Sequence, residues 1–186
     1  MKYRLINLIM VLSMLIGSLC LILLENVTMG RFLTYLGLII VIGLPFIFYK
    51  TMFMISQKQL FLYYVFVFLA DYLGCVCRFY DYIIWYDVVI HFLSGVLSVK
   101  LGLFVLEKFG VGKNYIFNII FSLITVMAIA GAWEIFEYAC DFIFCLDMQK
   151  SIFTGVRDTM QDMIAGLMGG ILYIEAMILK IKDVDV

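Results

Sequence analysis

Charged residues are scarce in this chain of 186 residues. They make up 15% of the sequence, whereas soluble domains carry about 25%. Hydrophobic residues make up 66%, compared with roughly 45 to 50% in soluble domains. Together, the two departures exclude a soluble fold and indicate an integral membrane protein.

The sequence also has little proline and no low-complexity tract. With one proline, Pro45, it lacks the composition of a linker between domains. We therefore predict a single transmembrane domain over residues 1–186. The net charge of −1 is not the basic excess of a nucleic-acid-binding protein, so we expect no nucleic-acid partner.

Cysteine pairs with C-x-x-C spacing are absent, which excludes a zinc-finger fold. The five cysteines lie in or beside apolar segments, and we expect most of them to be buried thiols. They are Cys20, Cys75, Cys77, Cys140 and Cys145. Whether any of them pair depends on separations that a sequence does not give.

What the chain does contain is a series of long hydrophobic stretches, and about 20 apolar residues cross a bilayer core as a helix. The six stretches cover about residues 5–24, 32–49, 59–78, 88–106, 115–140 and 159–179. Helices satisfy their backbone polar groups within each segment. The sequence thus predicts an all-α bundle of about six transmembrane helices in the plasma (inner) membrane.

Lys and Arg near the ends of the spans predict the orientation, because these residues favour the cytoplasmic side. One side collects Lys2, Arg4, Lys50, Lys58, Lys108, Lys113, Lys180 and Lys182. The other side collects Arg31, Arg78, Lys150 and Arg157. Both termini are therefore expected in the cytoplasm.

With this topology, carboxylates gather at the outer ends of spans three to six. They are Asp71, Asp81, Asp87, Glu134, Glu137, Asp141, Asp147, Asp158 and Asp162. The inner half keeps only Lys100 and Glu175. Because a charge within a bilayer costs at least about 2.5 kcal/mol, such residues usually face the bundle interior and serve a function.

Helical spacing places several of these acids on common faces, because residues three, four or seven apart are neighbours on a helix. The groups are Asp87 with the only histidine, His91; Glu134 with Glu137 and Asp141; and Asp158 with Asp162. The structural alternatives are helix-start carboxylates near the positive end of the dipole, a hydrogen-bonded core histidine and a helix end in the headgroup region.

Acids this close need a positive partner: protons, arginine or a metal. Arg78 and Arg157 are the candidate arginines, and Asp71 with Arg78 could form an ion pair seven residues apart. Carboxylates with one imidazole suit a divalent metal, whether Zn, Mn, Fe, Mg or Ca. The candidate ligands are Asp87, His91, Glu134, Glu137, Asp141, Asp158 and Asp162, and the candidate catalytic residues are Asp87, His91, Glu134, Glu137 and Asp162.

Three motifs resemble the uncharacterised bacterial inner-membrane family typified by YjdF. They are Asp87-x-x-x-His91-Phe92-x-x-Gly95, Trp133-Glu134-x-x-Glu137-x-x-x-Asp141, and Asp158-Thr159-x-x-Asp162 with Gly166 and Gly169. A more remote similarity is to VanZ-like proteins, but Val88 stands where their pattern has lysine and Glu137 where it has glutamine. The VanZ-like resemblance implies a role at the cell envelope, where that family is associated with glycopeptide resistance.

These observations favour a divalent-metal-dependent enzyme that acts on an outer-leaflet lipid or another envelope precursor, with metal-bound water as the nucleophile and leftover carboxylates as general base and acid. A cation or proton transporter is the first alternative, although its path would need to cross an inner half with few charges. A non-catalytic envelope or lipid-binding factor is the second. The oligomeric state stays open.

Overall fold

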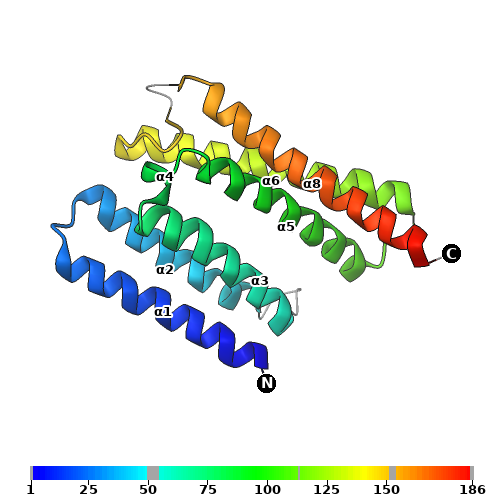
Figure 1. Ribbon diagram of the computed structural model, residues 1–186, viewed down its shortest axis with the longest axis horizontal. Helices are drawn as coiled ribbons and strands as arrows, with labels where there is room; N and C mark the ends of the chain where they lie inside the picture. Colours follow the sequence, from blue (N-terminus) through cyan, green and yellow to red (C-terminus); the bar gives the residue numbers. More distant parts are fainter. Residues whose placement is uncertain (1, 50–54, 113, 151–153, 185–186) are drawn as a thin grey trace. The chain divides into compact units, whose positions relative to one another are not determined.

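The computed structural model describes residues 2–49, 55–112, 114–150 and 154–184, which are almost entirely helical and contain no strand (Figure 1). The predicted all-α class is confirmed. The elements are α1 (Lys2–Leu24), α2 (Met29–Tyr49), α3 (Gln57–Val67), the π-helix η1 (Phe68–Val76), α4 (Phe79–Tyr82), α5 (Tyr86–Phe109), α6 (Tyr115–Phe144) and α8 (Arg157–Val184).

Six helical segments of the described chain are long and apolar enough to cross a membrane, which confirms the six predicted spans. The third segment combines α3 with η1 over Gln57–Val76. Lys50 and Lys113, which contributed to the predicted orientation, lie outside the described residues. The orientation of the termini stays a prediction.

Two of these helices begin at residues whose side chains cap the helix N-terminus. Ser56 caps α3 by accepting a hydrogen bond from the backbone N–H of Gln59, and the Gln59 side chain accepts one from the backbone N–H of Ser56. Asn114 caps α6 by accepting from the backbone N–H of Phe117. Both contacts satisfy N–H groups that the first helical turn leaves without partners.

The chain forms two compact units, residues 1–86 and 87–186, and each contains a buried hydrophobic cluster. Buried Met14, Leu38, Val67 and Val76 belong to the cluster of the first unit. Polar contacts in the N-terminal unit link Glu25 to Arg31, with 3.0 Å between the Arg31 guanidinium and a Glu25 carboxylate oxygen.

The possible ion pair between Asp71 and Arg78 is not among the ion pairs of the described residues. Arg78 instead pairs with Asp81, with 2.7 Å between Nε and Oδ2. Asp71 lies in η1, where i→i+5 hydrogen bonds widen the turn, so residues seven apart no longer share a face as they do in an α-helix. Arg78 follows η1 with φ 65°, which turns the chain into α4.

In the C-terminal unit, α5 and α8 touch through backbone atoms. A Cβ built on Gly95 would lie 1.8 Å from the carbonyl oxygen of Gly166, and one on Gly169 would lie 2.0 Å from the carbonyl oxygen of Phe92. Only glycine allows this approach, a common use of small residues between membrane helices. α6 packs along α8 in the same unit.

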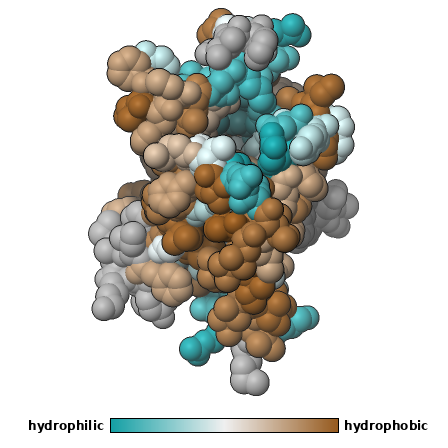
Figure 2. All heavy atoms as spheres, turned by 90° about the vertical axis from the view of Figure 1, so that its left-hand side faces the viewer, coloured by the Kyte–Doolittle hydropathy of each residue, from teal (hydrophilic) through white to brown (hydrophobic). Residues whose placement is uncertain are grey.

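Large hydrophobic side chains lie on the surface along most helices, as a lipid-facing protein requires (Figure 2). The expectation that most cysteines are buried is wrong. Cys20 and Cys145 are exposed, and Cys75, Cys77 and Cys140 are half-buried, because a membrane helix presents much of its apolar surface to lipid. None of the five forms a disulfide in the described chain.

Candidate polar site in the C-terminal unit

Asp87, His91 and Asp162 form a compact group near the starts of α5 and α8. One ligand atom from each residue lies within 4.8 Å of the others. His91 Nε2 is 3.4 Å from Asp87 Oδ1 and 3.9 Å from Asp162 Oδ2. His91 and Asp162 are 7% and 3% exposed, so two of the three residues are buried in the protein.

The glycine contact explains why these side chains meet. His91 lies four residues before Gly95, and Asp162 lies four residues before Gly166. Residues four apart stand one above the other on a helix face. The close approach of Gly95 to Gly166 therefore brings His91 and Asp162 together one turn away.

Lys150 brings a positive charge to these acids from the segment between α6 and α8. Its ammonium forms an ion pair with Asp87 Oδ2 and lies 3.7 Å from Asp158 Oδ2. Burial lowers the pKa of Lys150, but the hydrogen bond to Asp87 and the nearby carboxylates outweigh this effect and hold it above the usual value. Asp87 thus faces His91 through one oxygen and Lys150 through the other.

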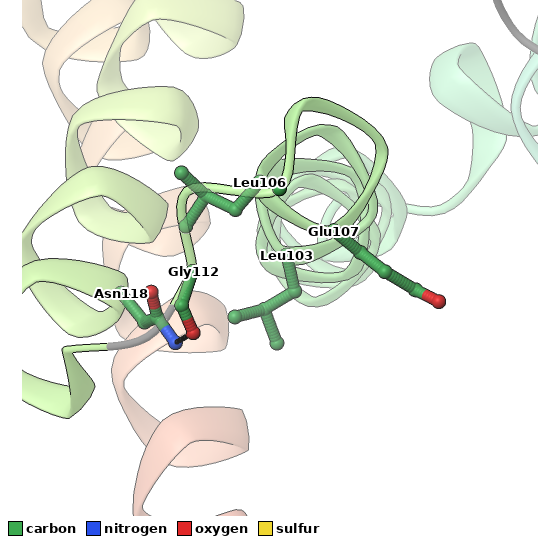
Figure 3. Close-up of a pocket in the computed structure, with 6 residues that line it drawn as sticks. Leu103, Leu106, Glu107, Gly112 and Asn118 are labelled. Carbon is green, nitrogen blue, oxygen red and sulfur yellow. Dashed lines mark hydrogen bonds between the residues drawn. The ribbon is translucent and has the colours of Figure 1, made fainter.

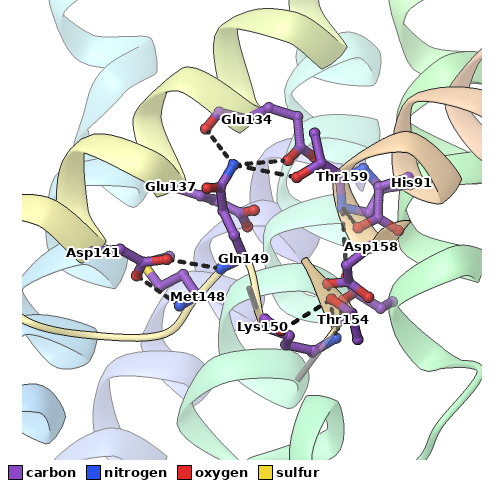
Figure 4. A network of polar contacts seen from close by, with 12 residues as sticks. His91, Glu134, Glu137, Asp141, Met148, Gln149, Lys150, Thr154, Asp158 and Thr159 are labelled. Carbon is purple, nitrogen blue, oxygen red and sulfur yellow. Dashed lines mark hydrogen bonds and ion pairs between the residues drawn. The ribbon is translucent and has the colours of Figure 1, made fainter. Parts of the chain in front are cut away.

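Asp141 and Gln149 hold the segment that carries Lys150 (Figure 4). The two carboxylate oxygens of Asp141 accept hydrogen bonds from the backbone N–H groups of Met148 and Gln149, at 2.7 and 3.0 Å. The Gln149 amide donates to the carbonyl oxygen of Glu134 at 3.1 Å and reaches the Thr159 hydroxyl at 3.3 Å. Asp141 therefore shapes the connection between α6 and α8.

Glu134 is a buried carboxylate with an incomplete set of partners. It is 5% exposed. Gln149 lies 3.4 Å from its Oε2, while Oε1 is buried and has no hydrogen-bond partner. A buried oxygen in this state costs about 1 to 3 kcal/mol unless some donor or cation compensates. Glu134 interacts electrostatically with Asp162 and Glu137, so this oxygen belongs to the same charged region.

Glu137 lies nearer the end of α6 and is half-buried. It accepts a hydrogen bond from the indole N–H of Trp133 at 2.8 Å. Because Trp133 is four residues earlier on the same helix, this contact fixes the carboxylate along the helix surface. Glu137 also interacts electrostatically with His91 and Asp87.

The predicted site residues thus fall into different positions within the C-terminal unit. Asp87, His91 and Asp162 converge, and Asp158 joins them through Lys150. Glu134 and Glu137 interact with this group electrostatically, and Asp141 binds the backbone of the connecting segment. Of the two arginines expected to neutralise the acids, Arg78 pairs with Asp81 in the N-terminal unit and Arg157 is exposed.

The sequence interpretation missed Lys150 and Gln149 as members of this site. It counted Lys150 only as a charge on the outer side and did not single out Gln149. The available signal was position: both residues lie in the short connection between two helices that bear acids. A lysine or glutamine side chain in such a connection can reach the ends of both helices. Helical spacing in the sequence does not reveal this.

The C-terminal unit also contains an open hollow (Figure 3). Leu103, Leu106, Glu107, Gly112 and Asn118 line it around the connection from α5 to α6. Leu106 is fifteen residues after His91, or about 22 Å along a helix. The hollow has no part in the polar site.

A family model described as "Predicted membrane protein (DUF2238)" matches residues 6–182, nearly the whole chain. This match agrees with the resemblance to a membrane family of the YjdF type, whereas the similarity to VanZ-like proteins stays a prediction. Searches of curated proteins and of solved structures each find no match.

Proposed function

We propose that this chain, which belongs to the DUF2238 family of predicted membrane proteins, binds a divalent cation through Asp87, His91 and Asp162 and hydrolyses a lipid or envelope substrate there. The observation that carries the proposal is the convergence of an imidazole nitrogen and two carboxylate oxygens within 4.8 Å. Two of the three residues are buried, and such groups in a membrane protein usually mark a functional site.

The donor set fits a divalent metal in both chemistry and spacing. Imidazole suits zinc and iron, whereas carboxylate also suits Mg, Ca and Mn. Ligands at about 2.1 Å from a tetrahedral metal lie about 3.4 Å apart. His91 Nε2 and Asp87 Oδ1 have this separation, and Asp162 Oδ2, at 3.9 Å from the same nitrogen, needs a small side-chain movement.

Glu134 is the candidate general base. A zinc ion held at the proposed site would lower the pKa of its bound water to near 7. The Oε1 atom of Glu134 has no partner and can accept a proton, while Gln149 holds the other carboxylate oxygen. Glu137, half-buried beside Trp133, can act as the general acid when its carboxyl group carries a proton, which it then donates to the leaving group.

Transport is less well supported by the same unit. A cation leaving the polar site along the helices would meet the buried cluster of Val99, Val126 and Ile174. Lys100, predicted to serve the inner half, lies 5.1 Å from the ring of Tyr173 in a cation–π contact. An apolar cluster gives a cation no ligands.

The test is metal content after purification in detergent and dialysis against a defined divalent metal. Wild type and Glu175→Gln are expected to retain the metal, because Glu175 is an exposed acid elsewhere on α8. His91→Ala and Asp162→Asn should bind it more than about 100-fold more weakly, since outer-shell changes alone cost 10- to 100-fold. Equal metal content in all four proteins would contradict the proposed site.

A second arm separates the enzyme from a binding factor. Glu134→Gln should keep the metal but release no headgroup or phosphate from a bacterial lipid extract, as measured by mass spectrometry, whereas wild type releases product. Turnover that survives in Glu134→Gln would remove Glu134 as the base. Metal binding without product from wild type would favour the non-catalytic alternative.

A further inference from the structure

Lys150 occupies part of the same acid cluster that the proposed function assigns to a metal. Its ammonium pairs with Asp87 and lies close to Asp158. It also interacts electrostatically with Asp162. The Lys150 charge therefore bears on two of the three proposed ligands, Asp87 and Asp162.

The connection to α6 tethers this ammonium beside the site. Asp141 and Gln149 fix the residues immediately before Lys150, through the hydrogen bonds described above. A tethered group acts at a high effective concentration, set by the length and stiffness of its tether. Lys150 consequently meets Asp87 far more often than a free monovalent cation does.

A divalent cation held by Asp87, His91 and Asp162 would lie near the ammonium and repel it, more strongly because both are partly withdrawn from water. Lys150 can yield. Its side chain is 36% exposed, and a lysine can swing its charged end to the surface while its methylene stem stays in place.

We propose that Lys150 is a tethered competitor for the cation site, which occupies Asp87 until a divalent cation displaces it. This inference rests on the proposed function. Competition by Lys150 would make the site select divalent over monovalent cations. A monovalent cation offers Asp87 no more charge than the ammonium already does. A divalent cation offers twice that charge and also gains His91, which an ammonium ion cannot use as a metal uses it.

The experiment measures Mn²⁺ affinity for wild type, Lys150→Met and Lys150→Arg in detergent. If Lys150 occupies Asp87 in about nine molecules of ten, Lys150→Met should bind Mn²⁺ about tenfold more tightly. Lys150→Arg, which keeps the charge, should stay near wild type. A purely structural role for Lys150 would instead lower the affinity of Lys150→Met, because Asp87 would lose its support.

The outcomes separate this inference from the proposed function. Equal or weaker Mn²⁺ binding by Lys150→Met, with binding by wild type, overturns the competitor role and leaves the metal site intact. Binding by neither protein overturns the proposed function as well.

A second measurement needs only the wild type and does not depend on a variant that folds. Labelling by an amine-reactive reagent, read by mass spectrometry, should increase at Lys150 when Mn²⁺ is added and stay constant at exposed Lys58. Unchanged or decreased labelling of Lys150 at saturating Mn²⁺ overturns the displacement.

Discussion

Glu25 in the N-terminal unit meets both Arg31 and the hydroxyl of Tyr35, whereas Glu134 in the C-terminal unit keeps a buried oxygen without a hydrogen-bond partner. The pairing of Arg78 with Asp81 repeats the first pattern. In the C-terminal unit, by contrast, Asp87 and Asp158 share Lys150, and His91 stands between Asp87 and Asp162.

This difference separates charges that are paired within the fold from the acids that the proposed function assigns to a cation. Exposed ion pairs such as Arg78 with Asp81 contribute at most about 1 kcal/mol. Buried acids that lack sufficient positive partners cost stability, so selection for folding alone would remove them. The function proposed above therefore uses only acids of the C-terminal unit, Asp87 and Asp162 with the neighbouring Glu134 and Glu137.

The largest expected effect comes from separating α5 from α8. Gly95→Ala places a methyl group against the backbone of Gly166, and overpacking of this kind costs about 1 to 3 kcal/mol. It should also weaken metal binding, since His91 and Asp162 would move apart. Thermal unfolding in detergent, together with metal affinity, checks both effects.

Gly131→Ala is the matched control for this prediction. Gly131 also lies in a helix of the C-terminal unit, but a Cβ there meets nothing within 4 Å. Alanine at this position should leave metal binding unchanged and stabilise the helix by about 0.5 to 1 kcal/mol. Equal stability of the two variants would contradict the close helix contact.

Asp141→Asn tests whether Asp141 is a metal ligand or only binds the backbone of the connecting segment. The sequence counted Asp141 among the metal ligands, whereas the structure uses both of its oxygens for backbone N–H groups. Since an amide offers one acceptor oxygen, the variant should lose about 1 to 2 kcal/mol of stability. Its metal affinity should stay the same or rise, because Lys150 is less well held. A fall in affinity like that of His91→Ala would restore Asp141 as a ligand.

The smallest effect concerns acid stability in the N-terminal unit. The hydrogen bond from Tyr35 and the charge of Arg31 hold the pKa of Glu25 below its ordinary value of 4.5. The stability that Glu25 contributes is therefore complete above about pH 4.5 and is lost as the pH falls through the lower folded pKa.

Glu25→Gln removes this dependence, so the acid-induced decrease in Tm should be smaller than in wild type, by about 1 to 3 °C. Thermal unfolding at a series of pH values from 6 downward measures the difference. Parallel curves for the two proteins would show that the Glu25 contacts do not support the folded unit.

Hydropathy was sufficient to predict the six spans, because a bilayer core demands about 20 apolar residues in each. The ends were less predictable. The last span-forming turns of α6 run to Phe144 rather than to about residue 140, and η1 interrupts the third span with a wider turn. Neither feature follows from a count of apolar residues.

Helical spacing predicted the pairs Asp87 with His91 and Asp158 with Asp162, because i, i+4 neighbours depend only on the helix itself. The contribution of Lys150, and the hydrogen bonds that Asp141 accepts from the connecting segment, depend instead on the path of the chain between α6 and α8. Such a path has no periodic pattern. The sequence therefore identified the acids as a group, but it did not show which of them contact Lys150, the backbone or one another.

X-ray absorption spectroscopy of the zinc-loaded protein tests whether Asp87, His91 and Asp162 bind a divalent cation. We expect nitrogen and oxygen ligands at about 2.0 to 2.2 Å, including one imidazole whose scattering disappears in His91→Ala. A sulfur ligand at about 2.3 Å would contradict it, since the metal would then bind a cysteine and not this site.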